Sequence, residues 1–216
     1  YAYYHGGGAI SANSSIVNIT NSSVSGNETP CHGGGLFVFS SAVTVSDGII
    51  GSNTGSDGGG LCLLHSTATL RASTISGNTV SHNGGGILSL SSNVIIHGGT
   101  INDNVAFYNG GGISTSNSSI AIENGNVSGN TAHSSYEFGY GGGGVFADNS
   151  NVAVANSIIS HNVATSNNGG GIYAIECSSL VLQGNTISNN QAKGSGGGIL
   201  KSYSSTVESI AGMLLN

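Results

Sequence analysis

The chain has 216 residues, 38 of them glycine, and its nine acidic and three basic residues give a net charge of −6. So little positive charge argues against nucleic acid and anionic membranes as partners. No apolar run approaches the ~20 residues of a membrane-spanning helix, which argues against membrane insertion of this segment.

Glycine triplets divide the chain into similar segments. They begin at Gly6, Gly33, Gly58, Gly84, Gly110, Gly142, Gly169 and Gly196. Most of them begin about 26 residues after the one before, and the interval from Gly110 to Gly142 is the longest. A repeat of this length is typical of a solenoid, in which each segment contacts only its neighbours.

Each repeat contains three short predicted strands in the same order. The first follows the triplet, as at Ile87, and the second places apolar residues two apart, as at Val94 and Ile96, which is the period of a strand. The third has an apolar residue three positions before an asparagine, as at Ile101 and Asn104. Such a repeat has no room for a helix as well. The pattern therefore predicts an all-β parallel β-helix of about eight coils, each about 25–27 residues long.

The most regular residues have structural explanations. Glycine triplets suit corners with positive φ or close backbone approach. The recurring asparagine predicts a ladder of stacked amides. Its members are Asn27, Asn53, Asn78, Asn104, Asn130, Asn162 and Asn190.

Two stretches show a resemblance to a known family. Residues 75–80 (ISGNTV) before 84–87 (GGGI), and residues 159–164 (ISHNVA) before 169–173 (GGGIY), resemble the polymorphic outer-membrane protein repeats of chlamydial adhesins, which are marked by GGA[IL] and FxxN. Here the third glycine replaces Ala, and Val or Ile replaces Phe. The resemblance implies a right-handed β-helix at a cell surface, often in an adhesive passenger region.

A column of apolar residues occupies the second position after the triplets. Strand alternation turns this column outward, and an exposed apolar strip predicts a lateral interface. The alternative is that an adjacent segment covers the strip. Its members are Ile10, Phe37, Leu88, Phe146, Tyr173 and Leu200.

The longest interval contains an insertion at residues 133–140, which predicts an inserted loop on one face of the rod. Tyr136, Glu137, Phe138 and Tyr140 form a candidate recognition loop, because tyrosine and phenylalanine contact both proteins and carbohydrates. A local packing loop is the alternative.

Asn-x-Ser/Thr motifs suggest N-glycosylation at Asn13, Asn18, Asn21, Asn117 and Asn126, as expected of a secreted glycoprotein, although composition alone predicts a similar number of motifs. Cys31, Cys62 and Cys177 occupy different repeat positions, so we expect free thiols, with a bond between Cys31 and Cys62 as the alternative.

No catalytic, metal or cofactor site is predicted. The acidic residues scatter over different faces, whereas glycoside hydrolysis needs a converging pair. His5 and His32, which both precede a triplet, are the nearest approach to metal-ligand stacking. A polysaccharide-active β-helix enzyme stays the alternative, and the broken column of Thr54, Thr79 and Val105 makes an ice-binding solenoid a minor one.

The sequence therefore predicts one β-helix segment over residues 1–216, part of a longer chain or a stacked assembly, since neither end has an obvious polar cap. Its expected role is that of a non-catalytic, extracellular or cell-surface structural scaffold in an adhesin or a filament. Expected partners are further copies, bound laterally or end to end, or a host or cell-surface protein or glycan.

Overall fold

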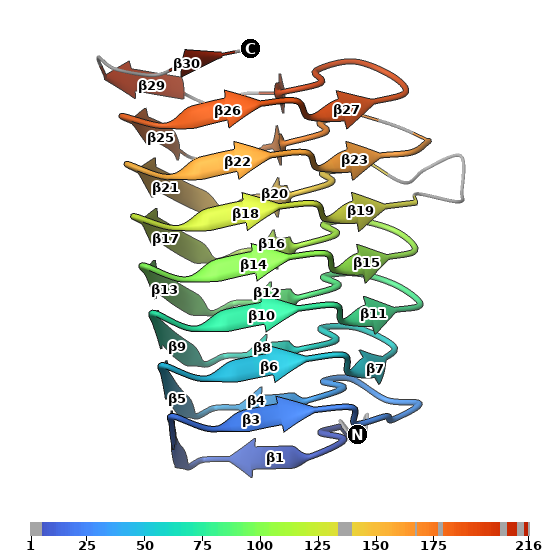
Figure 1. Cartoon of the computed structure of the whole chain (residues 1–216), viewed down its shortest axis with the longest axis vertical. Helices are drawn as coiled ribbons and strands as arrows, with labels where there is room; N and C mark the ends of the chain where they lie inside the picture. The colour runs from blue at the N-terminus through green and yellow to red at the C-terminus, as the bar shows by residue number, and fades with distance from the viewer. Residues whose placement is uncertain are drawn as a thin grey trace.

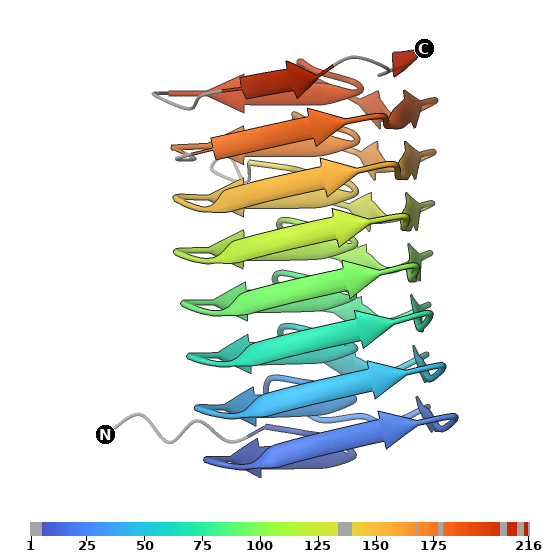
Figure 2. The ribbon, with the colours of Figure 1, turned by 90° about the vertical axis from the view of Figure 1, so that its left-hand side faces the viewer.

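Each repeat of the sequence folds into one coil of a parallel β-solenoid (Figure 1). The computed structural model describes residues 6–133, 140–166, 168–176, 179–203, 207–210 and 214–215, with side chains up to residue 203, and these residues include no helix. The front strands of Figure 1 run from left to right, the back strands return, and the chain climbs, so the coil is right-handed, as Figure 2 shows from the side. The predicted right-handed parallel β-helix is confirmed.

Four parallel sheets line the rod; each coil adds one strand to each of the first three, and the six strands of the fourth come from the inner coils. The first sheet contains β1 (Ile10–Asn13), β4 (Leu36–Phe39), β8 (Leu61–Leu64), β12 (Ile87–Leu90), β16 (Ile113–Ser116), β20 (Val145–Asp148), β24 (Ile172–Ile175) and β28 (Ile199–Ser202). The second contains β2 (Ile16–Thr20), β5 (Ala42–Ser46), β9 (Thr67–Arg71), β13 (Asn93–His97), β17 (Ser119–Glu123), β21 (Asn151–Ala155), β25 (Ser179–Gln183) and β29 (Val207–Ile210). The third contains β3 (Ser23–Ser25), β6 (Ile49–Gly51), β10 (Thr74–Ser76), β14 (Thr100–Asn102), β18 (Asn126–Ser128), β22 (Ile158–Ser160), β26 (Thr186–Ser188) and β30 (Leu214–Leu215). The fourth contains β7 (Thr54–Gly55), β11 (Thr79–Val80), β15 (Val105–Ala106), β19 (Thr131–Ala132), β23 (Val163–Ala164) and β27 (Gln191–Ala192).

The sequence pattern predicts only the first three of these sheets, because strands of two residues are too short to show a period. The stacked strands correspond to about seven full turns.

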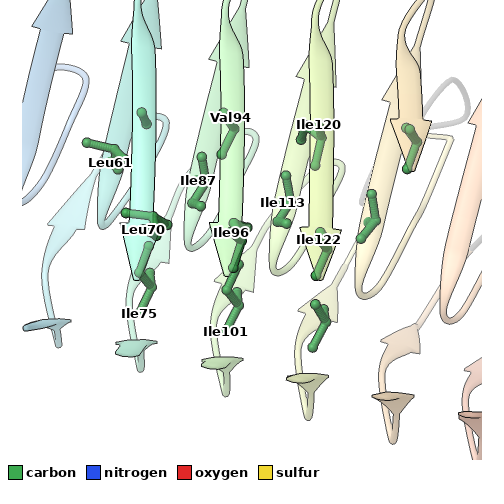
Figure 3. Packing of buried hydrophobic residues seen from close by; sticks show 14 of the residues in the cluster. Leu61, Leu70, Ile75, Ile87, Val94, Ile96, Ile101, Ile113, Ile120 and Ile122 are labelled. Carbon is green, nitrogen blue, oxygen red and sulfur yellow. The ribbon is translucent and has the colours of Figure 1, made fainter. Parts of the chain in front are cut away.

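Equivalent residues stack from coil to coil. Ile96 pairs with Leu70 on one side and Ile122 on the other, and all three side chains are fully buried (Figure 3). On the same strand Ile95 points outward, as the alternation of a strand requires. Each fully buried apolar side chain contributes roughly 1.5–3 kcal/mol, so the columns of this core stabilise the rod along its whole described length.

The corner before the first sheet requires glycine. Gly84, the first residue of its triplet, has φ of +66°, and its equivalents in the other coils are also left-handed. At the second position, a Cβ on Gly85 would lie 2.7 Å from the backbone N and C atoms of Val105. The triplets are therefore structural.

The first repeat is aligned one residue later than the sequence analysis assumed. Ile10 pairs with Leu36, and Ser11 pairs with Phe37. The left-handed glycine is Gly7, so residues 7–10 read GGAI, the tetrapeptide of the resembled family. The expectation that Ile10 belongs to the outward strip is therefore wrong: its side chain packs against the main core.

The rest of the outward strip does point away from the main core, but the expectation that it is exposed is wrong. Phe37, Leu88, Phe146 and Tyr173 are buried in two separate apolar clusters, and Leu200 is half-buried. Neighbouring residues cover them, since His32 stacks on Phe37 and Tyr140 stacks on Phe146. The strip therefore gives no reason to expect a lateral interface.

Candidate functional site

The repeats differ in length almost entirely in one part of the coil, the part between the ladder asparagine and the next left-handed glycine. From the left-handed glycine to the ladder asparagine, six of the seven coils have the same spacing, and the seventh has one residue more. From the ladder asparagine to the next left-handed glycine, the spacing more than doubles between the shortest segment, from Asn53 to Gly58, and the longest, from Asn130 to Gly142. We call the segments between the fourth and first sheets the variable corner. They are residues 29–32, 56–57, 81–83, 107–109, 133–141, 165–168 and 193–195.

The described residues of these segments lie on the right of Figure 1. Insertions in repeat proteins collect on one face, and that face is often the binding face. The variable corner is therefore the candidate functional site.

Next to the variable corner, between the third and fourth sheets, lies the predicted asparagine ladder. The side-chain amide of Asn78 donates to Oδ1 of Asn104 at 2.9 Å and to the carbonyl of Ile50 at 3.1 Å. The backbone amide of Asn78 donates to the same Oδ1 at 3.0 Å. The side-chain bond recurs at every step from Asn27 to Asn190, so the predicted ladder is present.

The variable corner has a second, shorter ladder, which the sequence analysis did not predict. Asn83 donates from its backbone to Oδ1 of Asp57 at 2.9 Å, and Asn109 donates from its side chain to Oδ1 of Asn83 at 3.2 Å. The backbone amides of Tyr140 and Gly141 donate to Oδ1 of Asn109. This ladder donates towards the N-terminus, whereas the long ladder donates towards the C-terminus, so the carboxylate of Asp57 ends it as a pure acceptor.

Two histidines flank that carboxylate. Nδ1 of His32 lies 3.3 Å from Oδ2 of Asp57, and Nδ1 of His82 lies 3.4 Å from the same oxygen. The Asp57 side chain is only 12% exposed, whereas both imidazoles are more than a third exposed. Gly6 pairs with His32, and His5, which was considered together with His32, lies outside the described residues.

The cluster shifts the titration of its members. The hydrogen bond to Asp57 raises the pKa of His32, burial opposes this, and the charge of the carboxylate adds to it. Burial alone would raise the pKa of Asp57, but the bonds from His32 and Asn83 and the charges of both histidines outweigh it, so the pKa is lowered. Burial and the Asp57 charge raise the pKa of Cys62, so this thiol is not an activated nucleophile.

A cavity of about 230 Å³ opens beside Asp57. Three leucines of the first sheet, Leu64, Leu88 and Leu90, supply apolar surface to it. The other lining residues are His32, Asp57, Cys62 and Asn83.

Aromatic and imidazole rings continue from this cavity along the corner. His82 stacks with Tyr108 at 5.2 Å between ring centroids, and Phe107 contacts His133 at the same separation. Phe107 and Tyr140 are 47% and 46% exposed. The corner thus combines flat apolar surfaces with polar groups, which suits recognition.

Other predicted site residues are distributed as follows. Tyr136, Glu137 and Phe138 lie outside the described residues, so only Tyr140 of the candidate loop is placed. Of the glycosylation candidates, four are exposed (Asn13, Asn18, Asn21 and Asn117) and Asn126 is half-buried.

Cys31 and Cys62 are unpaired, so the alternative bond between them is absent, and Cys177 lies outside the described residues. Within the described ranges, no three His, Cys, Asp or Glu side chains are arranged to hold a metal ion, and no helix is long and apolar enough to cross a membrane.

Sequence reasoning missed the His32–Asp57–His82 cluster. A signal was present, since one histidine lies a single repeat before Asp57 and the other a single repeat after it. The bend of each corner decides which of its side chains turns towards the next coil. The repeat period does not reveal this bend.

Comparison with known proteins agrees with this geometry. Residues 72–90 and 186–201 match the family model of the Chlamydia polymorphic membrane protein repeat. Two stretches of the chain, 35 of its 216 residues, are therefore similar to this repeat. The first match runs from the third sheet through the ladder residue Asn78 and the Gly84 corner to β12, which is most of one coil. Neither the curated proteins nor the solved structures contain a match to the chain.

Proposed function

We propose that this chain is a rigid, non-catalytic segment of a cell-surface protein, and that its variable corner binds the partner. One observation carries the proposal: the variation in repeat length is concentrated at the same corner as the exposed rings of Phe107 and Tyr140. Apart from one extra residue in one coil, the rest of the coil keeps the same length from repeat to repeat, as expected of a scaffold.

The hydrogen bonding supports rigidity. Every coil pairs with the next through the first three sheets, and the asparagine ladder adds a side-chain bond at each step, buried in the inner coils. An unbroken parallel stack holds the side chains of the corner at a fixed spacing of ~4.8 Å per coil. Such a surface is preorganised, which lowers the entropy cost of binding.

The repeat type supports a surface location. The matched repeat is that of polymorphic membrane proteins. The chain itself has few charged residues and many exposed Ser, Thr and Asn side chains, which suits an extended rod in contact with solvent.

Attachment of coated beads tests the proposal. Beads carrying the purified protein should attach to cultured cell monolayers or to extracellular material, and free protein should compete for attachment. Electron microscopy of the same preparation should show single rods. Absence of attachment together with filaments in the micrographs would overturn the proposal in favour of a self-assembling structural protein.

A further inference from the structure

The structure points to a binding site for neutral glycans, which we infer from the cavity beside Asp57. One sugar ring occupies this cavity, and the next ring lies against the stacked rings of His82 and Tyr108. This inference rests on the proposed function and deepens it, because it names the class of ligand and the position of the site on the variable corner.

The size of the cavity limits the ligand. Its volume of about 230 Å³ is below the roughly 300–1,000 Å³ of pockets for drug-sized ligands, so it accepts a group about as large as one ring. Leu64, Leu88 and Leu90 offer it an apolar surface. A sugar ring has such a face of C–H groups and a rim of hydroxyl groups.

The polar groups of the cavity match a rim of hydroxyls. Oδ1 of Asp57 accepts from the backbone and side-chain amides of Asn83, and Oδ2 lies 3.3 and 3.4 Å from Nδ1 of His32 and His82, so the carboxylate orients both imidazoles. Nδ1 of His32, which lines the cavity, and Nδ1 of His82, which lies beside it, face Asp57, which leaves Nε2 of each half-exposed ring for a ligand. A hydroxyl both donates and accepts, so it can bond to Nε2 of either form of an imidazole.

A flat surface lies next to the cavity. The rings of His82 and Tyr108 are 22° from parallel with centroids 5.2 Å apart, and His82 also contacts Asp57. The surface therefore begins at the edge of the site, where the second ring of a bound oligosaccharide would lie.

Charge distinguishes among glycans. The site contains a carboxylate whose pKa is lowered, so it is ionised at neutral pH, and the chain has a net charge of −6. A uronate or sulfated sugar would be repelled. A neutral oligosaccharide is therefore the fitting ligand.

Histidine NMR tests this inference directly. The ¹⁵N-histidine-labelled protein is titrated at neutral pH with maltotetraose, cellotetraose, chitotetraose and mannotetraose, and with tetragalacturonate as the charged probe. At least one neutral probe should shift the Nε2 signals of His32 and His82 and leave those of His97 and His161, on other parts of the coil, in place. No shift with any neutral probe at millimolar concentration, or binding of tetragalacturonate alone, would overturn the inference.

A variant with a matched control sharpens the test. Asp57→Asn should keep the fold, because Asn83 and Asn109 occupy the same column in the next coils. It should weaken binding by about tenfold or more, since the charged acceptor that orients both imidazoles is lost. His97→Ala, an exposed histidine of the second sheet, should leave binding unchanged. Unchanged affinity of the Asp57→Asn protein would contradict the assigned site.

Bead attachment separates this inference from the proposed function. Attachment that persists in the presence of saturating oligosaccharide, and in the Asp57→Asn protein, would refute the glycan site and leave the proposed function standing, with a protein as partner. Oligosaccharide binding without any bead attachment would support the glycan site and refute the adhesive role.

Discussion

The ladder corner and the variable corner lie beside each other in every coil, and both use stacked amides, yet they differ in order. At the ladder corner, asparagine recurs in seven successive coils, and its inner members, such as Asn104, are fully buried. At the variable corner, the ladder joins Asp57, Asn83 and Asn109 and then bonds to backbone amides at Tyr140 and Gly141. Loop length is constant beside the first ladder and varies beside the second.

The difference shows how the rod separates stability from recognition. A buried amide needs its partners at a fixed position, because an unpaired one costs about 1–3 kcal/mol. A half-exposed amide can bond to water instead, so insertions are tolerated there. The variable corner is thus the part of the coil in which sequence can change without loss of the fold.

The largest expected effect is in the body of the rod. Ile96→Asp places an unpaired charge in the core and should destabilise the protein by more than about 4 kcal/mol, enough to unfold several coils. Ile95→Asp is the matched control, because its side chain is on the same strand and 43% exposed. Circular dichroism during thermal unfolding measures both. A stable Ile96→Asp protein would show that the inward register is wrong.

Next in size is the contrast between the two ladders. Asn104→Ala removes both bonds that Asn78 donates to Oδ1 of Asn104, the bond to the carbonyl of Ile75 and one of the two bonds to Oδ1 of Asn130, and should cost about 3–5 kcal/mol. Asn109→Ala, in the half-exposed ladder, should cost about 1 kcal/mol. Urea unfolding of the two variants compares them. Equal losses would mean that the ladders do not differ in their contribution to stability.

A smaller effect is expected from the pH dependence of the variable corner. The raised pKa of His32 means that its bond to Asp57 stabilises the fold fully below the ordinary histidine value of 6.5 and is lost as pH rises through the raised value. The lowered pKa of Asp57 means that its contribution to the stability of the fold is present above the ordinary pKa of 3.8 and is lost as pH falls through the lowered pKa. The combined contribution of His32 and Asp57 to the stability should stay under about 1 kcal/mol, because His32 is partly exposed and solvent weakens the interaction.

Urea unfolding from pH 5 to pH 8 measures this effect. The stability difference between the wild type and Asp57→Asn should shrink as pH rises past the His32 titration. A difference that grows over this range would show that the histidine is not stabilised by the carboxylate.

The smallest expected effect is that of shortening the variable corner. Deleting residues 134–139 should change the melting temperature little, since the other coils close this corner with fewer residues. Deleting Gly98 alone, in the fixed turn between β13 and β14, should destabilise more, because it shifts the register of the next strand. Differential scanning calorimetry compares the two deletions, and a larger loss from the first would refute the assignment of the variable corner.

Much of the regular body can be predicted from the sequence, because period-two columns such as Val94 and Ile96, and an asparagine in each coil, have no other parallel arrangement that buries them. The register of Ile10 was predicted one residue too early because residues 6–8 form a glycine triplet, whereas the left-handed glycine that begins the turn is Gly7. The burial of Phe37 under His32, and the meeting of His32 and His82 at Asp57, depend on how corner residues fold over the first sheet. Such contacts between corners carry no period, so the pattern cannot reveal them.

Bead attachment by two matched variants tests most directly whether recognition belongs to the variable corner. Phe107→Ala with Tyr108→Ala alters the corner, and Ile95→Ala with Ile158→Ala removes similarly exposed side chains from the body. We predict that the corner variant loses most of its attachment and that the body variant attaches like the wild type. Loss of attachment in the body variant, with the corner variant unaffected, would contradict the central claim.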